Sequence, residues 1–404
     1  MPGFEEARRT ILESVAVLGA ERVDLLAAQG RVAAEDVAAP WEMPFYDNSA
    51  MDGFAVRAGD CRTGGILRVA GYVPAGEGGV SAAAPGCAVR IMTGAAMPPD
   101  CDTVVPIEEI EERADGILLR EKVVPRQHVR FRGEDIRQGD RIVSAGTILR
   151  SPEISMLASF GKAYPSVHRR AQVAVLSTGD ELVEVGEAPE HGKVVNSNAL
   201  SLAAALREIG AEAAILGIAR DDRESHLRLM NEGLKADALI TTAGVSAGDR
   251  DLVRACLAEL GVRQLFWKVD IKPGGPFAFG MKEGKPVFSL PGNPVSSMIT
   301  FEELVRPALL RMMGRRRVIR PLVRAALRGD VRKKPGKVQF LRVRVEVEDG
   351  RYLAVSAGDQ NTGILSTMVR ANGIAVLPKE RTGFAAGEEV PVHLLHDDLG
   401  MLEE

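Results

Sequence analysis

Polar segments in the first third of the sequence combine acids, hydroxyls and glycines in patterns that could do chemistry. The segment PFYDNSAMDGFA holds two loop carboxylates, Asp47 and Asp52, a residue type that suits cation binding or proton transfer. In RIMTGAAMPPDCD an apolar run ends at Thr93, whose hydroxyl and following amides could hold an oxyanion. Ordinary turns, in which such side chains bond to nearby backbone, are the favoured explanation for the first segment alone and explain the second about as well.

A third segment, HVRFRGEDI, carries charges of both signs. Its charged side chains are Arg130, Arg132, Glu134 and Asp135. Ion pairing within the segment is one explanation, because exposed pairs are common and contribute little to stability. The alternative is that the arginines meet an anion, and the sequence leaves that choice open.

Two segments place polar residues directly after apolar runs that predict buried strands. VAVLSTGDEL continues into Ser177, Thr178, Gly179, Asp180 and Glu181. ALITTAGVSAGDRD supplies Gly244, Ser246, Gly248, Asp249 and Asp251. Glycines let backbone N–H groups approach an anion, and carboxylates bind hard cations, so the second segment is typical of a loop for phosphate with Mg²⁺. Neither GxxxxGK[ST] nor GxGxxG occurs, which disfavours nucleoside triphosphate or NAD binding.

Lysines and a proline-rich turn follow. In KVDIKPGGPFAFG, Lys268 and Lys272 are four apart with strand-like residues between them, and we expect them to share one face and present two charges to an anion. In VFSLPGNPVSS a buried strand passes through Pro291, Asn293 and Pro294 into a helix. The unpaired amides at the start of that helix could bind an anion, with capping as their minimal role.

The elements around these segments alternate between strands and helices from Ala171 to about Gly314. Strands are predicted at residues 173–176, 213–219, 238–242 and 286–290, and helices at 201–209, 224–234, 251–260 and 295–313. Such alternation is typical of a doubly wound α/β domain, in which ligands bind at the carboxyl ends of the strands. Three polar segments would meet at that edge, which favours a phosphate-bearing ligand.

The rest of the chain is predicted to be mainly β. Between Pro40 and Gly139, short β-like runs are broken by Gly, Pro and Asp. Near the C-terminus, VQFLRVRVEVEDGRYLAVS resembles a hairpin whose turn is Asp349 and Gly350. We therefore expect one β domain before the doubly wound domain and a small barrel after it.

Composition restricts the function further. The 404 residues exceed what one core organises, and no apolar run is long enough for a membrane span, so we expect a multi-domain cytoplasmic protein without a membrane partner. The net charge of -4 disfavours bulk nucleic-acid binding. Neither disulfides nor structural zinc are expected, because no CxxC, HxxxH or HExxH spacing occurs among the cysteines and histidines.

Seven motifs, in this order, resemble those of molybdopterin molybdenumtransferases: PFYDNSAMDGFA, RIMTGAAMPPDCD, RFRGEDI, STGDEL, TTAGVSAGDRD, IKPGGPFAFG and SLPGNPVSS. The resemblance covers nearly the whole chain and implies a multi-domain α/β and β fold. The expected parts are a stalk (21–39 and 140–170), an inserted mostly β domain (40–139), a doubly wound domain similar to molybdopterin adenylyltransferases (1–20 and 171–318) and a C-terminal β-barrel (319–404).

The resemblance also implies an activity. Members of the family insert molybdenum from molybdate into adenylyl-molybdopterin and release AMP, which yields the molybdenum cofactor. They work as homodimers with the active site between subunits, and docking of a molybdopterin adenylyltransferase is a further expected contact. Mg²⁺ is the expected cofactor, with Asp251 and Asp221 as its carboxylate ligands.

Matching positions carry the family's functional residues into this sequence. The expected catalytic residues are Asp52, Thr93, Asp135 and Glu181, and the expected anion-binding residues include Arg130, Lys268, Lys272, Pro291 and Pro294. By hypothesis the two lysines and Arg130 offset the charge of molybdate, while Glu181 and Asp52 handle protons. Two departures are Gly275, where relatives often carry lysine, and DQNTGILSTM, which matches the family's serine-rich tail segment only loosely.

Three alternatives remain at this point. Tungstate has nearly the size and charge of molybdate, and the sequence does not separate the two. A pterin-binding scaffold could keep the same fold without turnover. An adenylyltransferase would use a similar doubly wound domain, but ATP dependence would reveal it.

Overall fold

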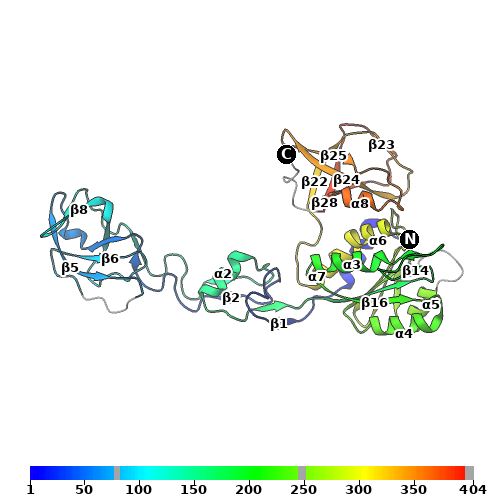
Figure 1. The fold of residues 1–404 in the computed structure, drawn as a ribbon, viewed down its shortest axis with the longest axis horizontal. Helices are drawn as coiled ribbons and strands as arrows, with labels where there is room; N and C mark the ends of the chain where they lie inside the picture. Colours follow the sequence, from blue (N-terminus) through cyan, green and yellow to red (C-terminus); the bar gives the residue numbers. More distant parts are fainter. Residues whose placement is uncertain (77–81, 244–251, 396–404) are drawn as a thin grey trace. The chain divides into compact units, whose positions relative to one another are not determined.

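The structure, a computed structural model, describes residues 1–76, 82–243 and 252–395 and divides into two compact units (Figure 1). The first unit contains Met1–Ala34, Ile148–Arg150 and Ser166–Glu404, and the second contains Glu35–Thr147 and Ser151–Pro165. In sequence, the second unit is thus inserted into the first. Where the first unit resumes, β12 (Ser166–His168) pairs antiparallel with β1 (Ala20–Arg22).

A six-stranded sheet forms the centre of the first unit, in the order β16-β13-β17-β21-β20-β18. Its strands are β13 (Gln172–Thr178), β16 (Glu212–Ala219), β17 (Ala238–Thr242), β18 (Arg263–Phe266), β20 (Ala278–Lys282) and β21 (Lys285–Leu290). β16, β13, β17 and β21 pair in parallel, as the alternation of strands and helices predicts. β20 and β18 add two antiparallel strands at one edge.

Alternate residues of β13 face two different cores. The surrounding helices are α1 (Phe4–Ser14), α3 (Ser197–Glu208), α4 (Arg223–Gly233), α5 (Leu252–Glu259) and α6 (Pro294–Thr300). Val173 and Val175 pack with residues of α1, α3 and α6, whereas Ala174 and Leu176 pack with residues of α4 and α5. Burial on both faces explains the continuous apolar run of this strand. The predicted doubly wound α/β domain is therefore confirmed.

The last helix of this domain spans residues 294–312, which confirms the helix predicted over 295–313, but its middle turn is irregular. A π-helical turn, η3 (Phe301–Val305), separates α6 from α7 (Arg306–Met312). Pro307 has no N–H group, so the regular bond to the carbonyl of Glu303 is missing, and a wider turn takes up the irregularity. The predicted helix is therefore present, with one irregular turn inside it.

The C-terminal part of the first unit is a closed barrel. Its strands are β22 (Leu322–Leu327), β24 (Val338–Glu348), β25 (Arg351–Ser356), β26 (Gly373–Leu377) and β28 (Glu389–Leu394), and the pairing of β24 with both β25 and β26 closes it. Asp349 and Gly350 have φ angles of 47° and 74°, which confirms the predicted hairpin turn. Shorter elements here are β23 (Val331–Arg332), α8 (Ser366–Arg370) and β27 (Gly383–Phe384).

The second unit is mainly β, as predicted. Its sheet has the order β7-β4-β6-β5-β9-β8 and consists of β4 (Gly53–Val56), β5 (Ile66–Val73), β6 (Cys87–Ile91), β7 (Thr103–Pro106), β8 (Ile110–Arg113) and β9 (Gly116–Leu119). Short pairs outside it join β3 (Asn48–Ser49) to β10 (Val129–Arg130) and β2 (Val37–Ala38) to β11 (Arg141–Val143). One helix, α2 (Ser151–Ser159), also belongs to this unit.

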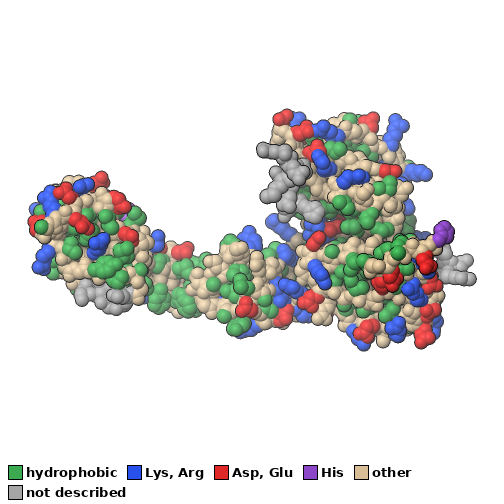
Figure 2. Space-filling model, in the orientation of Figure 1, with side chains coloured by type: hydrophobic (Ala, Val, Ile, Leu, Met, Phe, Trp, Pro, Cys, Tyr) green, Lys and Arg blue, Asp and Glu red, His purple; other side chains and the backbone are tan. Residues whose placement is uncertain are grey.

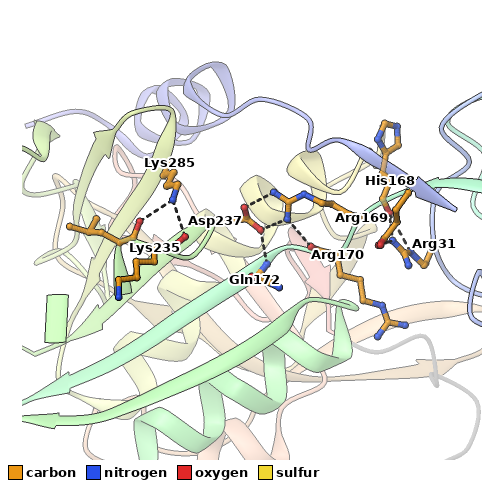
Figure 3. Close-up of polar contacts among 10 residues, drawn as sticks. Arg31, His168, Arg169, Arg170, Gln172, Lys235, Asp237 and Lys285 are labelled. Carbon is orange, nitrogen blue, oxygen red and sulfur yellow. Dashed lines mark hydrogen bonds and ion pairs between the residues drawn. The ribbon is translucent and has the colours of Figure 1, made fainter. Parts of the chain in front are cut away.

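At the amino-terminal edge of the α/β sheet, an ion pair joins the start of two strands (Figure 3). Arg169 donates to both oxygens of Asp237, at 2.5 and 2.6 Å, and the backbone N–H of Gln172 adds a third bond. Burial acts to raise the pKa of Asp237, but these bonds outweigh it and hold that pKa below its usual value. Elsewhere on the described surface, acidic and basic side chains are interspersed in the view of Figure 2.

Candidate active site

The carboxyl ends of β13 and β17 are joined by buried hydroxyls. Ser177 Oγ donates to Asn196 Oδ1 at 2.8 Å and accepts from Thr242 Oγ1 at 3.2 Å. Thr178 Oγ1 donates to the carbonyl oxygen of Thr242. Ser177 and Thr178 were expected to bind substrate, but the structure turns their hydroxyls toward protein groups. We therefore assign them to holding the edge of the sheet together.

After the buried Gly179 that follows β13, Asp180 and Glu181 are exposed and carry charge at this edge. Gly179 has a φ of 134°, and a side chain there would overlap the carboxylate of Glu181, which folds back over it. Asp180 and Asp221 are linked reciprocally, because the backbone N–H of each donates to the carboxylate of the other, at 3.5 and 3.2 Å. The predicted residues Glu181 and Asp221 thus lie with Asp180 at the ends of the neighbouring strands β13 and β16.

The turn between β21 and α6 contributes buried oxygens. Asn198 Nδ2 donates to the carbonyl of Gly292 at 2.8 Å and fixes this turn against α3. Among the described residues, four buried side-chain oxygens have no hydrogen-bond partner, and three of them belong to this turn or to the helices beside it: Asn198 Oδ1, Asn293 Oδ1 and Ser297 Oγ. An unpartnered buried polar atom costs about 1–3 kcal/mol. Pro291 and Pro294 frame a turn that can therefore accept hydroxyl or amine donors from a ligand.

Lys268 and Lys272 do not lie on one continuous strand, which corrects the expectation from the sequence. Only Ile271–Lys272 forms a strand, β19, and it pairs in parallel with β24 of the barrel. Val269 and Ile271 are buried between the two exposed lysines, and the backbone N–H of Val269 bonds to Gly275 rather than to a neighbouring strand. The alternation of buried and exposed residues was correct, whereas the regular strand was not.

Lys337 is a basic residue at this site that the sequence analysis missed. Its Nζ lies 3.6 Å from the position that a Cβ atom on Gly275 would occupy. Lys337 directly precedes β24, and the pairing of Ile271 with Val338 brings it to the KPGG segment. The run RKKPGK is a signal in the sequence, but the pairing that directs it here is not local.

The loop between β17 and α5 lies outside the described residues. Gly244, Ser246, Gly248, Asp249 and Asp251, which were expected to bind phosphate and Mg²⁺, all belong to it. In the part of the chain that is described, no three His, Cys, Asp or Glu side chains form a group that could hold a metal. Asp180 and Asp221 supply two carboxylates, which suit a hard cation that also binds phosphate oxygens.

A second group of predicted residues comes together in the inserted unit. The backbone N–H and the Oγ1 of Thr93 both donate to Asp52 Oδ1 at 2.7 Å. These two bonds lower the pKa of Asp52. Asp52 is therefore an ionised carboxylate held by Thr93, and interpreting it as a simple turn-former is wrong. A carboxyl group with a lowered pKa is a weak base, which disfavours a role in accepting protons.

Three segments of the inserted unit converge around this pair. Gly94 donates its backbone N–H to Ser49 at 2.8 Å, and β10 pairs Arg130 with Asn48. Arg130 and Asp135 are exposed. Pairing within HVRFRGEDI does not explain its charges: Arg132 pairs with Glu42, outside the segment. Within the segment, Glu134 accepts a hydrogen bond from the backbone N–H of Phe131.

Known protein families match the chain in three consecutive parts. Residues 3–161 match the MoeA N-terminal region (domain I and II), residues 174–311 a probable molybdopterin binding domain, and residues 324–395 the MoeA C-terminal region (domain IV). None of the described helices has the length and apolar character needed to cross a membrane. Together with the fold, these matches define a multi-domain protein of molybdenum cofactor biosynthesis.

Individual relatives match from end to end. The chain is 36% identical over 402 residues to a molybdopterin molybdenumtransferase of Haemophilus influenzae, covering 98% of this chain and 99% of that protein. It is 34% identical over 405 residues to molybdopterin molybdenumtransferase 2 of Mycobacterium tuberculosis, covering 97% and 99%. A crystal structure of the molybdopterin biosynthesis moea protein from Pyrococcus horikosii shares 32% identity, with a TM-score of 0.85 over 98% of this chain and 99% of that one. The chain belongs to the family of molybdopterin molybdenumtransferases.

Proposed function

We propose that this protein inserts molybdenum from molybdate into adenylyl-molybdopterin, with release of AMP. The observation that carries the proposal is the carboxyl edge of the α/β sheet, where exposed acids, buried unpartnered oxygens and lysines meet. Family membership supplies the substrate class, because relatives that match nearly the whole chain carry the name molybdopterin molybdenumtransferase.

The phosphates of the substrate would lie along the strand ends. Backbone N–H groups at the start of α6 can donate to phosphate oxygens, and Asn198 and Asn293 can accept from ligand hydroxyls. Mg²⁺ is part of the proposal. Asp180 and Asp221 would hold it, together with the predicted ligand Asp251, and the ion would offset the charge of the phosphates.

Molybdate is a dianion, and the lysines near β19 would offset its charge. We assign this task to Lys268, Lys272 and Lys337, with Arg130 from the inserted unit. Glu181, exposed and next to the phosphate path, would handle protons, whereas Asp52 would act as a fixed negative charge. Molybdenum itself would bind to the two dithiolene sulfurs of the pterin, since soft ligands suit it and the protein offers scattered free thiols.

Assembly and location complete the proposal. Homodimer formation, with the active site between subunits, and docking of a molybdopterin adenylyltransferase rest on the resemblance of the seven motifs. A cytoplasmic location is proposed on the same basis.

The test is a coupled assay with purified protein. Adenylyl-molybdopterin, Mg²⁺ and micromolar molybdate are mixed, and AMP release is measured together with reconstitution of an apo-molybdoenzyme. Both products are expected. Replacing molybdate by tungstate ranks the metals, and omitting Mg²⁺ tests the cofactor. Pterin binding without either product would overturn the proposal and leave a scaffold, and a requirement for ATP would indicate an adenylyltransferase.

Lys337 provides a sharper test of the anion site. We predict that Lys337→Ala raises the KM for molybdate roughly tenfold, about 1.4 kcal/mol, with a smaller effect on kcat. The reason is that a cation near the oxyanion contributes mainly to its binding. Lys334→Ala, an exposed residue of the same basic run, is the control. Equal KM values for both variants and the wild type would remove Lys337 from the site.

A further inference from the structure

A pocket of about 230 Å³ lies between α5 and the strands β18, β20 and β21. Its floor follows from the register of these strands. Gly280 lies between Gln264 of β18 and Val287 of β21, and in the next row Ala278 is paired with Ser289. Glycine, alanine and serine at adjacent positions on one face leave the hollow beneath α5.

The walls of the pocket are apolar and its mouth is aromatic. Leu257 and Val262 line one side, and Phe279 contributes from β20. At the mouth, the guanidinium of Arg254 lies over the ring of Trp267, 5.2 Å from its centroid. Apolar and aromatic walls with few polar groups are typical of sites for small organic ligands.

Two hydroxyls connect the pocket with the candidate active site. Ser289 is 1% exposed and stands two residues before Pro291 of the β21–α6 turn. Its neighbour in the parallel pairing is Thr241, which is fully buried and whose Oγ1 has no hydrogen-bond partner among the described residues. A ligand that lies along the strand ends could therefore extend one ring into the pocket.

We propose that this pocket binds a planar nitrogen heterocycle of the substrate, either the purine of the adenylyl group or the pterin. The inference rests on the proposed function and adds the place where one ring binds. The ring would pack between Leu257 and the small residues of the floor, with Trp267 at its edge. Its ring nitrogens and amine would meet Ser289 and Gln264.

The test compares ligands with and without a ring. Calorimetric titrations would use AMP, pterin-6-carboxylate and ribose 5-phosphate. We expect AMP or the pterin to bind at least tenfold more tightly than ribose 5-phosphate. The protein has two tryptophans, so in a Trp41→Phe background Trp267 is the remaining one, and its fluorescence should change with the ring-containing ligand alone.

Ala278→Leu would fill the pocket and should weaken binding of that ligand at least tenfold, whereas Ala204→Leu on the exposed face of α3 should not. Trp267→Ala, at the half-exposed mouth, repeats the test if Ala278→Leu fails to fold. Equal binding of all three ligands, no binding of either ring, or unchanged affinity in the pocket variants would overturn the inference. Molybdate-dependent turnover of the wild type is measured separately, so failure of the proposed function is distinguishable.

Discussion

Two cysteines of the inserted unit are in surroundings that suppress their chemistry. Burial, with nearby Asp60 and Asp102 adding to it, raises the pKa of Cys61 to about 11, and burial raises the pKa of Cys101 to about 11 as well. The thiolate is the reactive form of cysteine. At pH 8 we therefore predict alkylation by iodoacetamide roughly a hundredfold slower than for the same thiols in urea, measured by mass spectrometry.

The raised pKa values of these two thiols also predict how the stability of the protein changes with pH. Their pKa in the folded state lies above the ordinary thiol value of 9.0. Their contribution to stability is thus complete below pH 9 and is lost as the pH rises toward 11. Melting temperatures between pH 8 and 11 should fall more steeply for the wild type than for the Cys61→Ala/Cys101→Ala variant. If the melting temperatures of both proteins fell equally with pH, this contribution of the thiols to stability would be contradicted.

For single residues, the sequence predicted which residue types lie at the strand ends, but not which way their side chains point. STGDEL correctly located a strand end, yet Ser177 and Thr178 are buried while Asp180 and Glu181 are exposed. Asp52 accepts two hydrogen bonds from Thr93, which is 41 residues away along the chain. Local spacing carries no information about such a partner, because the pairing depends on how the sheet of the inserted unit folds.

Among the elements, a buried pair connects the π-helical turn η3 with the barrel. His393 Nδ1 of β28 lies 2.9 Å from Glu303 Oε1 of η3, and Arg8 of α1 approaches the other oxygen at 4.0 Å. We predict that Glu303→Ala lowers the free energy of unfolding of the first unit by about 3 kcal/mol, because it leaves His393 and Arg8 buried without this partner. Urea denaturation measures the change.

Glu5→Ala is the matched control for that substitution. Glu5 also pairs with Arg8, but its side chain is 74% exposed. Exposed pairs contribute about 0–1 kcal/mol, so this variant should unfold almost like the wild type. Similar losses for Glu5→Ala and Glu303→Ala would show that burial of the pair does not matter.

Elements with a strong local signal were the ones that the sequence predicted well. The βαβ alternation identified β13, β17 and β21, and the Asp349–Gly350 turn identified the hairpin. The antiparallel strands β18 and β20 were not predicted as strands of this sheet, because their neighbours depend on tertiary pairing. The short β19 was mistaken for part of a longer strand, since its partner β24 lies in another domain.

For the whole molecule, the decisive question is whether one active site uses two subunits. Asp52 belongs to the inserted unit and Lys272 to the first unit. We predict that Asp52→Ala and Lys272→Ala proteins, each inactive alone, regain about a quarter of wild-type activity when mixed and re-equilibrated. Half of the dimers are then mixed, and each of these has one intact site out of two.

Light scattering before the assay establishes whether the protein is a dimer. A mixture of two copies of the Asp52→Ala protein, one carrying a neutral tag, is the control for exchange. Activity that stays at the background of the single variants, although subunits have exchanged, would assign both residues to a site within one chain.

The first unit is built from segments that are far apart in the sequence, and this affects how it folds during synthesis on the ribosome. The ribosome makes helix α1 before its packing partners η3 and α7, which follow about 300 residues later. Phe340, whose ring centroid lies 5.0 Å from that of Phe4, is made later still. At usual translation speeds this is a delay of roughly 15 to 60 s. During that time the inserted unit can complete its own fold, while the apolar face of α1 is exposed to chaperones in the nascent chain.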